Sequence, residues 1–188
     1  MSAKGRGVTS PAEVRRVRLH EWAEIRDLRM AAVSDPAASM AFLTTLEEER
    51  ARDEAAWRDR ASAAALGEDA AQFVAVEGDS WVGSVSVLLR TSGDRDHLGR
   101  TLDAPRADVV GVFIAPAARG AGLLDRLIDA AATWAAGHGA DALTLDVHRD
   151  NARAQAAYRR IGFVPTGVAF TSVIGPEIEM RKPLERRI

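Results

Sequence analysis

The feature that most constrains the fold is an apolar run that leads through a proline into a glycine-containing turn. Residues 108–114 read Asp-Val-Val-Gly-Val-Phe-Ile, and residues 115–122 read Ala-Pro-Ala-Ala-Arg-Gly-Ala-Gly before a helical pattern begins. A nearly unbroken apolar run is typical of a central strand that is covered on both faces. Glycine lets the backbone turn sharply or approach a ligand closely. The segment therefore predicts a buried strand, a tight turn and a helix.

The turn at 116–122 has the features of an anion site. The first N–H groups of a helix have no partner within the helix, and the helix dipole adds partial positive charge there. Such groups bind phosphate or diphosphate, and the guanidinium of Arg119 can add a charged fork. A glycine pair also occurs in strand-to-helix turns that bind nothing, so the segment alone leaves both interpretations open. The sequence has neither G-x-x-x-x-G-K-[ST] nor a fitting G-x-G-x-x-G, which disfavours a generic nucleotide-binding protein.

The remaining patterns predict a single α/β domain over residues 13–188. Residues 1–12 are rich in glycine, serine and basic side chains, so we expect a disordered tail there. We expect strands at 14–19, 72–77, 81–90, 108–114, 143–147, 162–164 and 178–180. We expect helices at 20–33, 120–138 and 151–161, and one or two exposed helices at 47–66.

Composition excludes several classes of protein. The chain has 25 Lys and Arg residues against 27 Asp and Glu, a net charge of −2, which gives no overall positive field for nucleic acid. It has no cysteine, which excludes disulfides, thiolate nucleophiles and cysteine-based metal sites. No run reaches the roughly 18 apolar residues of a membrane span, and no apolar segment near the N-terminus suggests a signal peptide. We therefore expect a cytoplasmic protein without nucleic-acid or membrane partners.

A second motif follows about 25 residues after the turn. Asn151 is suited to cap the helix predicted after it. Asn151, Ala154 and Tyr158 fall at positions i, i+3 and i+7, so they share one helix face. That face would hold an amide, a small gap and a phenol beside one ligand. The alternative for Tyr158 is a core tyrosine whose hydroxyl is hydrogen-bonded.

The order of the two motifs resembles the GCN5-related N-acetyltransferase (GNAT) family. The shared pattern is strand, Pro-x-x-Arg-Gly-x-Gly, helix, strand and Asn-x-x-Ala-x-x-x-Tyr-x-x-x-Gly-Phe, over residues 108–167. The resemblance implies an α/β (α+β) fold with a mixed, mostly antiparallel twisted sheet of six to seven strands. About four flanking helices and a splayed pair of central strands belong to that fold.

The resemblance also implies an activity. It implies acetyl-CoA as acyl donor, no metal, and transfer of the acetyl group to a primary amine of an unidentified acceptor, either a small molecule or a protein or peptide N-terminus. An acyl-CoA-binding module without turnover is the alternative. Homodimers are common in the family, so a homodimer is compatible with the resemblance.

By this resemblance, one set of positions would bind the cofactor. They are Val112, Phe113, Ile114, Arg119, Gly120, Ala121, Gly122, Leu123, Leu124, Asn151, Ala154 and Tyr158. The first three would pair their backbone with the pantetheine arm, and residues 119–124 would hold the diphosphate. Leu124 departs from the family pattern, in which a small residue is usual. Asn151 matches the asparagine that binds the cofactor arm, and Tyr158 matches the phenol near its sulfur.

Transfer to an amine requires proton movements. The amine attacks only when neutral, so a base or a water chain must take its proton. The leaving thiolate needs a proton, and a phenol with a pKa near ~10 is suited to supply it, so Tyr158 is the predicted general acid. The first candidate for the base is Asp146, where ribosomal-protein N-acetyltransferases of this family place an acid. Asp108 is the second candidate and His148 the third.

The acceptor groove of such folds is built by the first helical pair and the late strands. Here these segments correspond to residues 35–45 and 168–175. Phe42 and Phe170 are apolar candidates for that groove, and ordinary packing is the alternative for both.

Overall fold

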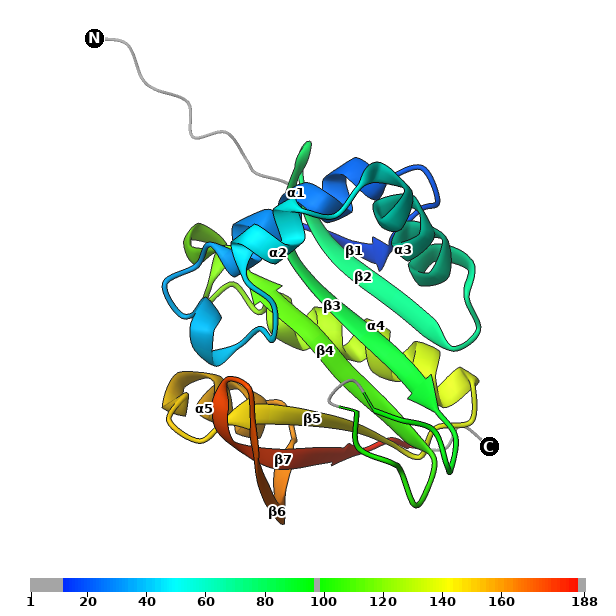
Figure 1. The fold of residues 1–188 in the computed structure, drawn as a ribbon, viewed down its shortest axis with the longest axis vertical. Coiled ribbons are helices and arrows are strands. Elements are labelled where there is room, and N and C mark those ends of the chain that lie inside the picture. Colours follow the sequence, from blue (N-terminus) through cyan, green and yellow to red (C-terminus); the bar gives the residue numbers. More distant parts are fainter. Residues whose placement is uncertain (1–11, 97–98, 186–188) are drawn as a thin grey trace, which may run out of the picture.

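A seven-stranded sheet, in the order β1-β2-β3-β4-β5-β7-β6, forms the centre of the protein (Figure 1). The computed structural model describes residues 12–96 and 99–185. The strands are β1 (Glu13–Arg16), β2 (Ala70–Glu77), β3 (Ser80–Arg90), β4 (Arg106–Ile114), β5 (Ala142–His148), β6 (Val164–Ser172) and β7 (Gly175–Pro183). Among the strand pairs of these residues, β4–β5 alone is parallel, which confirms the expected mixed, mostly antiparallel sheet.

The helices within the described ranges number five, which agrees with the expected three helices and one or two more at 47–66. They are α1 (Trp22–Val33), α2 (Leu46–Arg50), α3 (Glu54–Leu66), α4 (Leu123–Gly137) and α5 (Ala152–Arg160), with short 3-10 turns at Ala38–Met40 and Pro116–Ala118. The tail expected at residues 1–12 lies outside the described residues except for Ala12, which is buried. None of the helices in the described residues is both long and apolar enough to cross a membrane.

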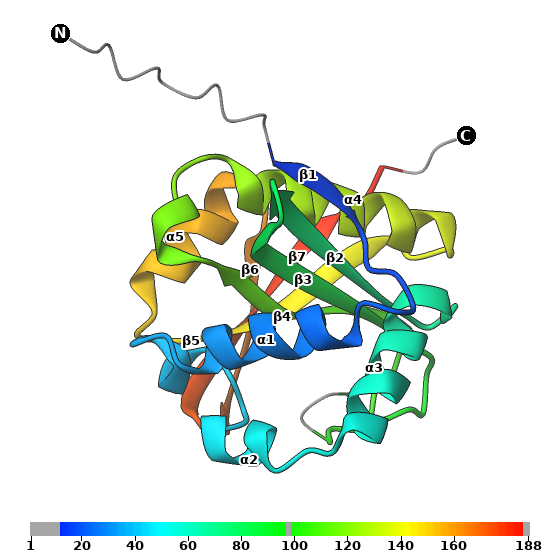
Figure 2. The ribbon, with the colours of Figure 1, turned by 90° about the horizontal axis from the view of Figure 1, so that it is seen from above.

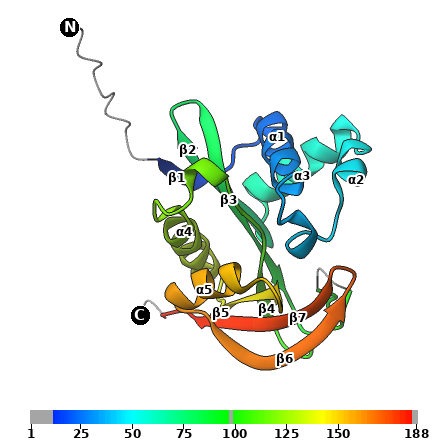
Figure 3. The same ribbon diagram turned by 90° about the vertical axis from the view of Figure 1, so that its left-hand side faces the viewer.

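The helices cover opposite faces of the sheet (Figures 2 and 3). Helix α4 packs on one face, where Leu127 and Ile128 meet apolar residues of the central strands. Helices α1, α2 and α3 lie on the other face. The expectation of exposed helices at 47–66 was incomplete, because Trp57 and Ala61 of α3 are buried against Val74 of β2. Only one stripe of α3 is apolar, and that stripe faces the sheet.

Helix α4 begins three residues later than the expected start at residue 120. Gly120 and Gly122 both have positive φ values, 83° and 73°, which are incompatible with α-helical backbone. The two glycines therefore belong to the turn, and the helix begins at Leu123 immediately after them.

Strands β4 and β5 separate after a single ladder pair, Asp108 with Thr144. Strand β4 also carries an irregularity where its register with β3 shifts between Ser84 and Ser86. Gly111 lies at this bulge with a φ of 62°, a left-handed conformation that favours glycine. A bulge bends its strand and interrupts the ladder. Among the described residues, the edge of β4 that faces β5 has no strand partner over residues 109–114, so the predicted splayed pair is present.

Candidate functional site

A cavity of about 1110 Å³ is lined by both of the separated strands. Its walls include the turn before α4, the ends of β5 and β7, helix α5 and residues of α1, α2 and α3. The sequence-predicted catalytic and cofactor residues that line it are Val112, Phe113, Ile114, Arg119, Gly120, Gly122, Leu123, Leu124, Asp146, His148, Asn151, Ala154 and Tyr158. Ala121 and Asp108 are not among the lining residues. The fold thus brings together two motifs that are separate in the sequence.

The turn before α4 leaves its N–H groups open to the cavity. Gly122 is the N-cap of α4, and no side chain caps this end of the helix. A Cβ built on Gly120 or Gly122 would meet no atom within 4 Å, so the space beside the turn is open. Unpaired N–H groups at the positive end of a 15-residue helix make this end of the cavity suited to an anion.

Arg119 lines the cavity, but its guanidinium already has protein partners. Nε donates to the carbonyl oxygen of Ile114 at 3.0 Å, and Nη2 donates to Oδ2 of Asp35 at 2.5 Å. The N–H of Ala37 lowers the pKa of Asp35, and the Arg119 guanidinium lowers it further against the opposing effect of burial. Arg119 therefore ties the end of β4 to the loop after α1. Arg153 of α5, which sequence reasoning missed, also lines the cavity.

Helix α5 presents Asn151, Ala154 and Tyr158 to the cavity, as their spacing predicts. Oδ1 of Asn151 accepts a hydrogen bond from the N–H of Ala154 at 3.1 Å, which confirms the predicted cap. The ring of Tyr158 packs edge-on against Phe163, with 5.8 Å between ring centroids. Burial raises the pKa of Tyr158 to about 12, so the phenol keeps its proton at neutral pH. Across the described ranges, no residue is hydrogen-bonded to its hydroxyl.

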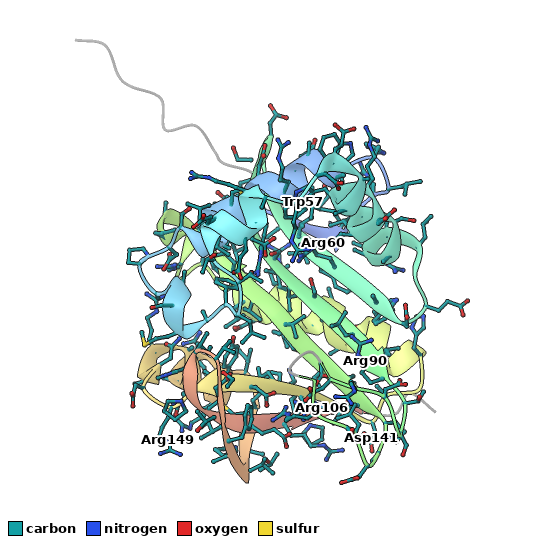
Figure 4. The ribbon with its side chains drawn as sticks, viewed as in Figure 1. Trp57, Arg60, Arg90, Arg106, Asp141 and Arg149 are labelled. Carbon is teal, nitrogen blue, oxygen red and sulfur yellow. The ribbon has the colours of Figure 1, made fainter. Side chains whose placement is uncertain are left out.

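The two aspartates proposed as bases both belong to a buried network of ion pairs. Arg106, labelled in Figure 4, donates to Asp108 and to Glu179, and also to Asp146 at 3.2 Å. Arg100 donates to Oδ2 of Asp146 at 2.6 Å. Burial lowers the pKa of Arg106, but the surrounding carboxylates raise it more, so its pKa lies above the ordinary value. The oxygens of Asp146 are thus engaged by two arginines, and Asp108 is fully buried outside the cavity lining.

Sequence reasoning missed Glu177, the acidic residue of β7 that lines the cavity. It lies directly opposite His148 in the β5–β7 ladder, and both residues are buried, at 4% and 7% exposure. Within residues 12–96 and 99–185, Oε1 of Glu177 has no hydrogen-bond partner. Nδ1 of His148 accepts from the N–H of Asp150 at 3.1 Å. Alternation in Glu177-Ile178-Glu179-Met180 indicates that the glutamates share a face, but only the strand register shows what they oppose.

The two aromatic candidates for the acceptor groove have different surroundings. Phe42 lines the cavity, and the guanidinium of Arg29 lies over its ring at 4.6 Å. Phe170 is not a lining residue, and the guanidinium of Arg100 lies 3.9 Å from its ring centroid. Residues of the segment after α1 therefore contribute more to this cavity than residues of β6.

Comparisons with solved structures show the same fold in several acetyltransferases. A putative acetyltransferase from Salmonella typhimurium, solved with its cofactor acetyl-CoA, is 18% identical, with 95% of this chain and 97% of that chain covered at a TM-score of 0.69. A phosphinothricin acetyltransferase of the GNAT superfamily from Sinorhizobium meliloti, solved with acetyl-CoA, is 16% identical, with 93% and 89% covered at a TM-score of 0.68. A GNAT-family acetyltransferase from Streptococcus pneumoniae is 19% identical, with 93% and 99% covered at a TM-score of 0.64.

The family assignment comes from the sequence match. No curated protein matches the chain. Among the residues that the structure describes, no group of three or more His, Cys, Asp or Glu side chains is arranged to hold a metal ion. The model of the acetyltransferase (GNAT) family matches residues 22–163, well over half of the chain and the whole region from α1 to the end of α5. This protein therefore belongs to the GNAT family of acetyltransferases.

Proposed function

We propose that this protein transfers the acetyl group of acetyl-CoA to a primary amine, and that residues 13–188 form the acetyltransferase domain. The observation that carries the proposal is one cavity, within the described residues, that joins an open anion-binding turn, a strand edge that has separated from its neighbour, a phenol that can donate a proton and a carboxylate that can accept one. Family membership and two similar structures that contain acetyl-CoA support the choice of donor.

The residues of the cavity fit the parts of acetyl-CoA. The backbone N–H groups of residues 120–124 would bind the diphosphate at the N-terminus of α4. The edge of β4 that faces away from β3 at residues 112–114 would offer backbone groups to an extended chain, as an unpaired strand edge does. The carbonyl oxygen of Ile114 on this segment already accepts from Arg119. Asn151 and Ala154 would lie along the same arm, since both line the cavity from α5. When bound, acetyl-CoA supplies an activated acetyl thioester.

Tyr158 is the proposed general acid. Its phenol keeps its proton at neutral pH, and its hydroxyl is not committed to another described residue, so it can donate that proton to the departing sulfur. The unpaired N–H groups of β4 provide fixed dipoles that stabilise negative charge on the acetyl oxygen.

We propose Glu177, rather than Asp146 or Asp108, as the group that takes the proton of the amine. Oε1 of Glu177 is buried in the cavity wall without a hydrogen-bond partner among the described residues. Asp146 and Asp108 instead pair with arginines, and we propose that they position the Arg100 and Arg106 side chains. Of these three acids, Glu177 is the one that both lines the cavity and has an oxygen without a hydrogen-bond partner among the described residues.

The proposal is tested by measuring release of free CoA thiol from acetyl-CoA with a panel of primary amines. We expect release that depends on both protein and amine, with the acetylated amine identified by mass spectrometry. Binding of acetyl-CoA without release for any amine would contradict the proposed turnover and would instead favour an acyl-CoA-binding module.

A further inference from the structure

The wall of the cavity that is formed by α1, α2 and α3 carries an excess of positive charge. Arg29, Arg52 and Arg60 line this wall, and Glu49 is the carboxylate that lies among them. Glu49 is 1% exposed and accepts from Nε of Arg29 at 2.9 Å and from Nε of Arg52 at 2.8 Å. The hydroxyl of Thr44 donates to it as well, at 2.5 Å. Three guanidinium groups thus share one carboxylate, whose oxygens are already occupied by two of them.

Arg60 is the arginine of the three that forms no ion pair with Glu49. The side chain comes from α3 and lies over the sheet near Trp57, as Figure 4 shows. Its contact among the described residues is a stacking contact, 5.8 Å from the Trp57 ring, with no ion pair or hydrogen bond. Burial, reinforced by the charge of Arg29, lowers its pKa to about 10, so the group is still cationic at neutral pH.

A half-buried cation that has no ion pair of its own, and only shares the charge of Glu49 with two other arginines, is unfavourable unless a partner anion binds it. The same cavity is also lined by Glu177 of β7, whose carboxylate suits an ammonium group. Given the proposed transferase function, we propose that the acceptor is an amine that also carries an acidic group, a carboxylate or a phosphate, and that Arg60 binds this group. The amine would lie toward Glu177 and the acidic group toward α3.

The anion bound by Arg60 belongs to the acceptor and not to the cofactor. The cofactor phosphates are assigned to the turn before α4, and α4 packs on the opposite face of the sheet from α3 (Figure 3). Arg60 lies on α3, which packs against Val74 of β2, and Gln72, two residues before Val74 on the same strand face, also lines the cavity. This is the face that α1 and α3 cover.

The test uses matched pairs of amines that differ only in the acidic group. Free amino acids are compared with their carboxamides, and ethanolamine phosphate with ethanolamine, by release of CoA thiol. The variants are Arg60→Gln, Arg60→Lys and, as a control, Arg58→Gln. Arg58 lies on the same helix but is exposed and paired with Glu54 at 2.7 Å. Thermal melts of each variant establish that it is folded.

We expect the wild-type protein to prefer the acid-bearing member of one pair, which identifies carboxylate or phosphate as the group bound. Arg60→Gln should raise KM for that amine by at least about tenfold, the size expected for a hydrogen-bonded charge, with kcat little changed. Arg60→Lys should retain part of the affinity, and Arg58→Gln should behave as wild type.

Three results would overturn the inference. Equal KM values for the two members of every pair would do so while leaving the transferase function intact. A rise in KM for acetyl-CoA instead of the amine, on Arg60→Gln, would assign Arg60 to the cofactor. If no amine is acetylated, the proposed transferase function fails. Calorimetric titration of the CoA-loaded protein with the free amino acids and ethanolamine phosphate then tests the acid site by itself. If these compounds do not bind, or bind equally well to the wild-type protein and to Arg60→Gln, the acid site is rejected as well.

Discussion

At the scale of single residues, the chemistry proposed here depends on two side chains that reach the cavity from different elements. Tyr158 comes from α5 and could be identified from the sequence, because a local motif with fixed spacing carries it. Glu177 comes from β7, and no local pattern distinguishes it from Glu179. Its significance depends on the register that sets it opposite His148, and this register is a long-range property that the sequence pattern does not reveal.

Replacing Tyr158 by Phe removes the proposed acid and keeps the ring that packs against Phe163. We expect kcat to fall by about 100-fold or more, the usual contribution of general acid catalysis, while acetyl-CoA affinity stays nearly unchanged. Steady-state kinetics and calorimetric titration with acetyl-CoA measure the two quantities. Full activity in this variant would remove Tyr158 from the mechanism.

Glu177→Gln removes the proposed proton acceptor with little change in side-chain volume. We expect kcat/KM to fall by about 100-fold and its pH dependence to flatten, because the residual reaction must draw on the small fraction of amine that is already neutral. Glu179→Gln is the matched control, since Glu179 shares the strand face but pairs with Arg106 and is not a lining residue. Loss of activity in the Glu179 variant alone would contradict the assignment.

At the scale of elements, the sequence predicts the strand, turn and helix around residues 108–138 because each has a strong local signal. The helices at 46–66 are less predictable, since the buried stripe of α3 contains one large apolar residue, Trp57, and otherwise small alanines. Strand β6 is exposed along most of its length, so no alternation marks its true extent. Its length is set by pairing with β7, and for this reason only residue 164 of the predicted 162–164 strand lies in β6.

The turn before α4 provides a prediction with a close internal control. Gly122→Glu puts a carboxylate at the proposed diphosphate site, and we expect CoA affinity to fall at least tenfold, or about 1.4 kcal/mol. Gly139→Glu, near the other end of α4, adds the same charge at a similar positive φ of 87°. Each substitution should cost about 1–2 kcal/mol of folding stability from left-handed strain.

Calorimetric titration with CoA separates the two glutamate variants. Only the Gly122 variant should lose affinity, since Gly139 is not a lining residue of the cavity. Equal affinity in the two variants would show that the anion site lies elsewhere.

At the scale of the whole molecule, buried ion pairs join segments that are distant in sequence. Glu49 joins α1 to the α2–α3 connection through Arg29 and Arg52, and Arg119 joins the end of β4 to the loop after α1. In the sequence, these charged residues cannot be distinguished from the other charged residues of the chain. Which of them pair depends on the packing of the three helices against the sheet. The sequence alone therefore could not show that Arg60 would have no ion pair among the described residues.

The buried ion pairs predict sensitivity to acid. Burial raises the pKa of Glu49, but its hydrogen bonds with Thr44 and the two arginines lower it more, so folding lowers the pKa overall. A lowered pKa in the folded state contributes stability in full above the unfolded value of about 4.3, and this contribution is lost as the pH falls through the folded value.

Thermal melts from neutral pH to below about pH 4.3 measure this loss of stability. We expect Tm to fall on acidification below about pH 4.3. Glu49→Gln should lower Tm at neutral pH, because it leaves Arg29 and Arg52 without their carboxylate. On acidification, the Tm of this variant should then fall by less than the Tm of the wild type. An equal fall in Tm for the wild type and the variant would contradict this role of Glu49.

The most direct test of the whole account is a crystal structure of the protein with bound CoA. The account predicts diphosphate oxygens within hydrogen-bond distance of the N–H groups of residues 120–124. It also predicts the pantetheine arm along the free edge of β4 and the sulfur beside the hydroxyl of Tyr158. A diphosphate bound away from the start of α4, or a sulfur remote from Tyr158, would contradict it.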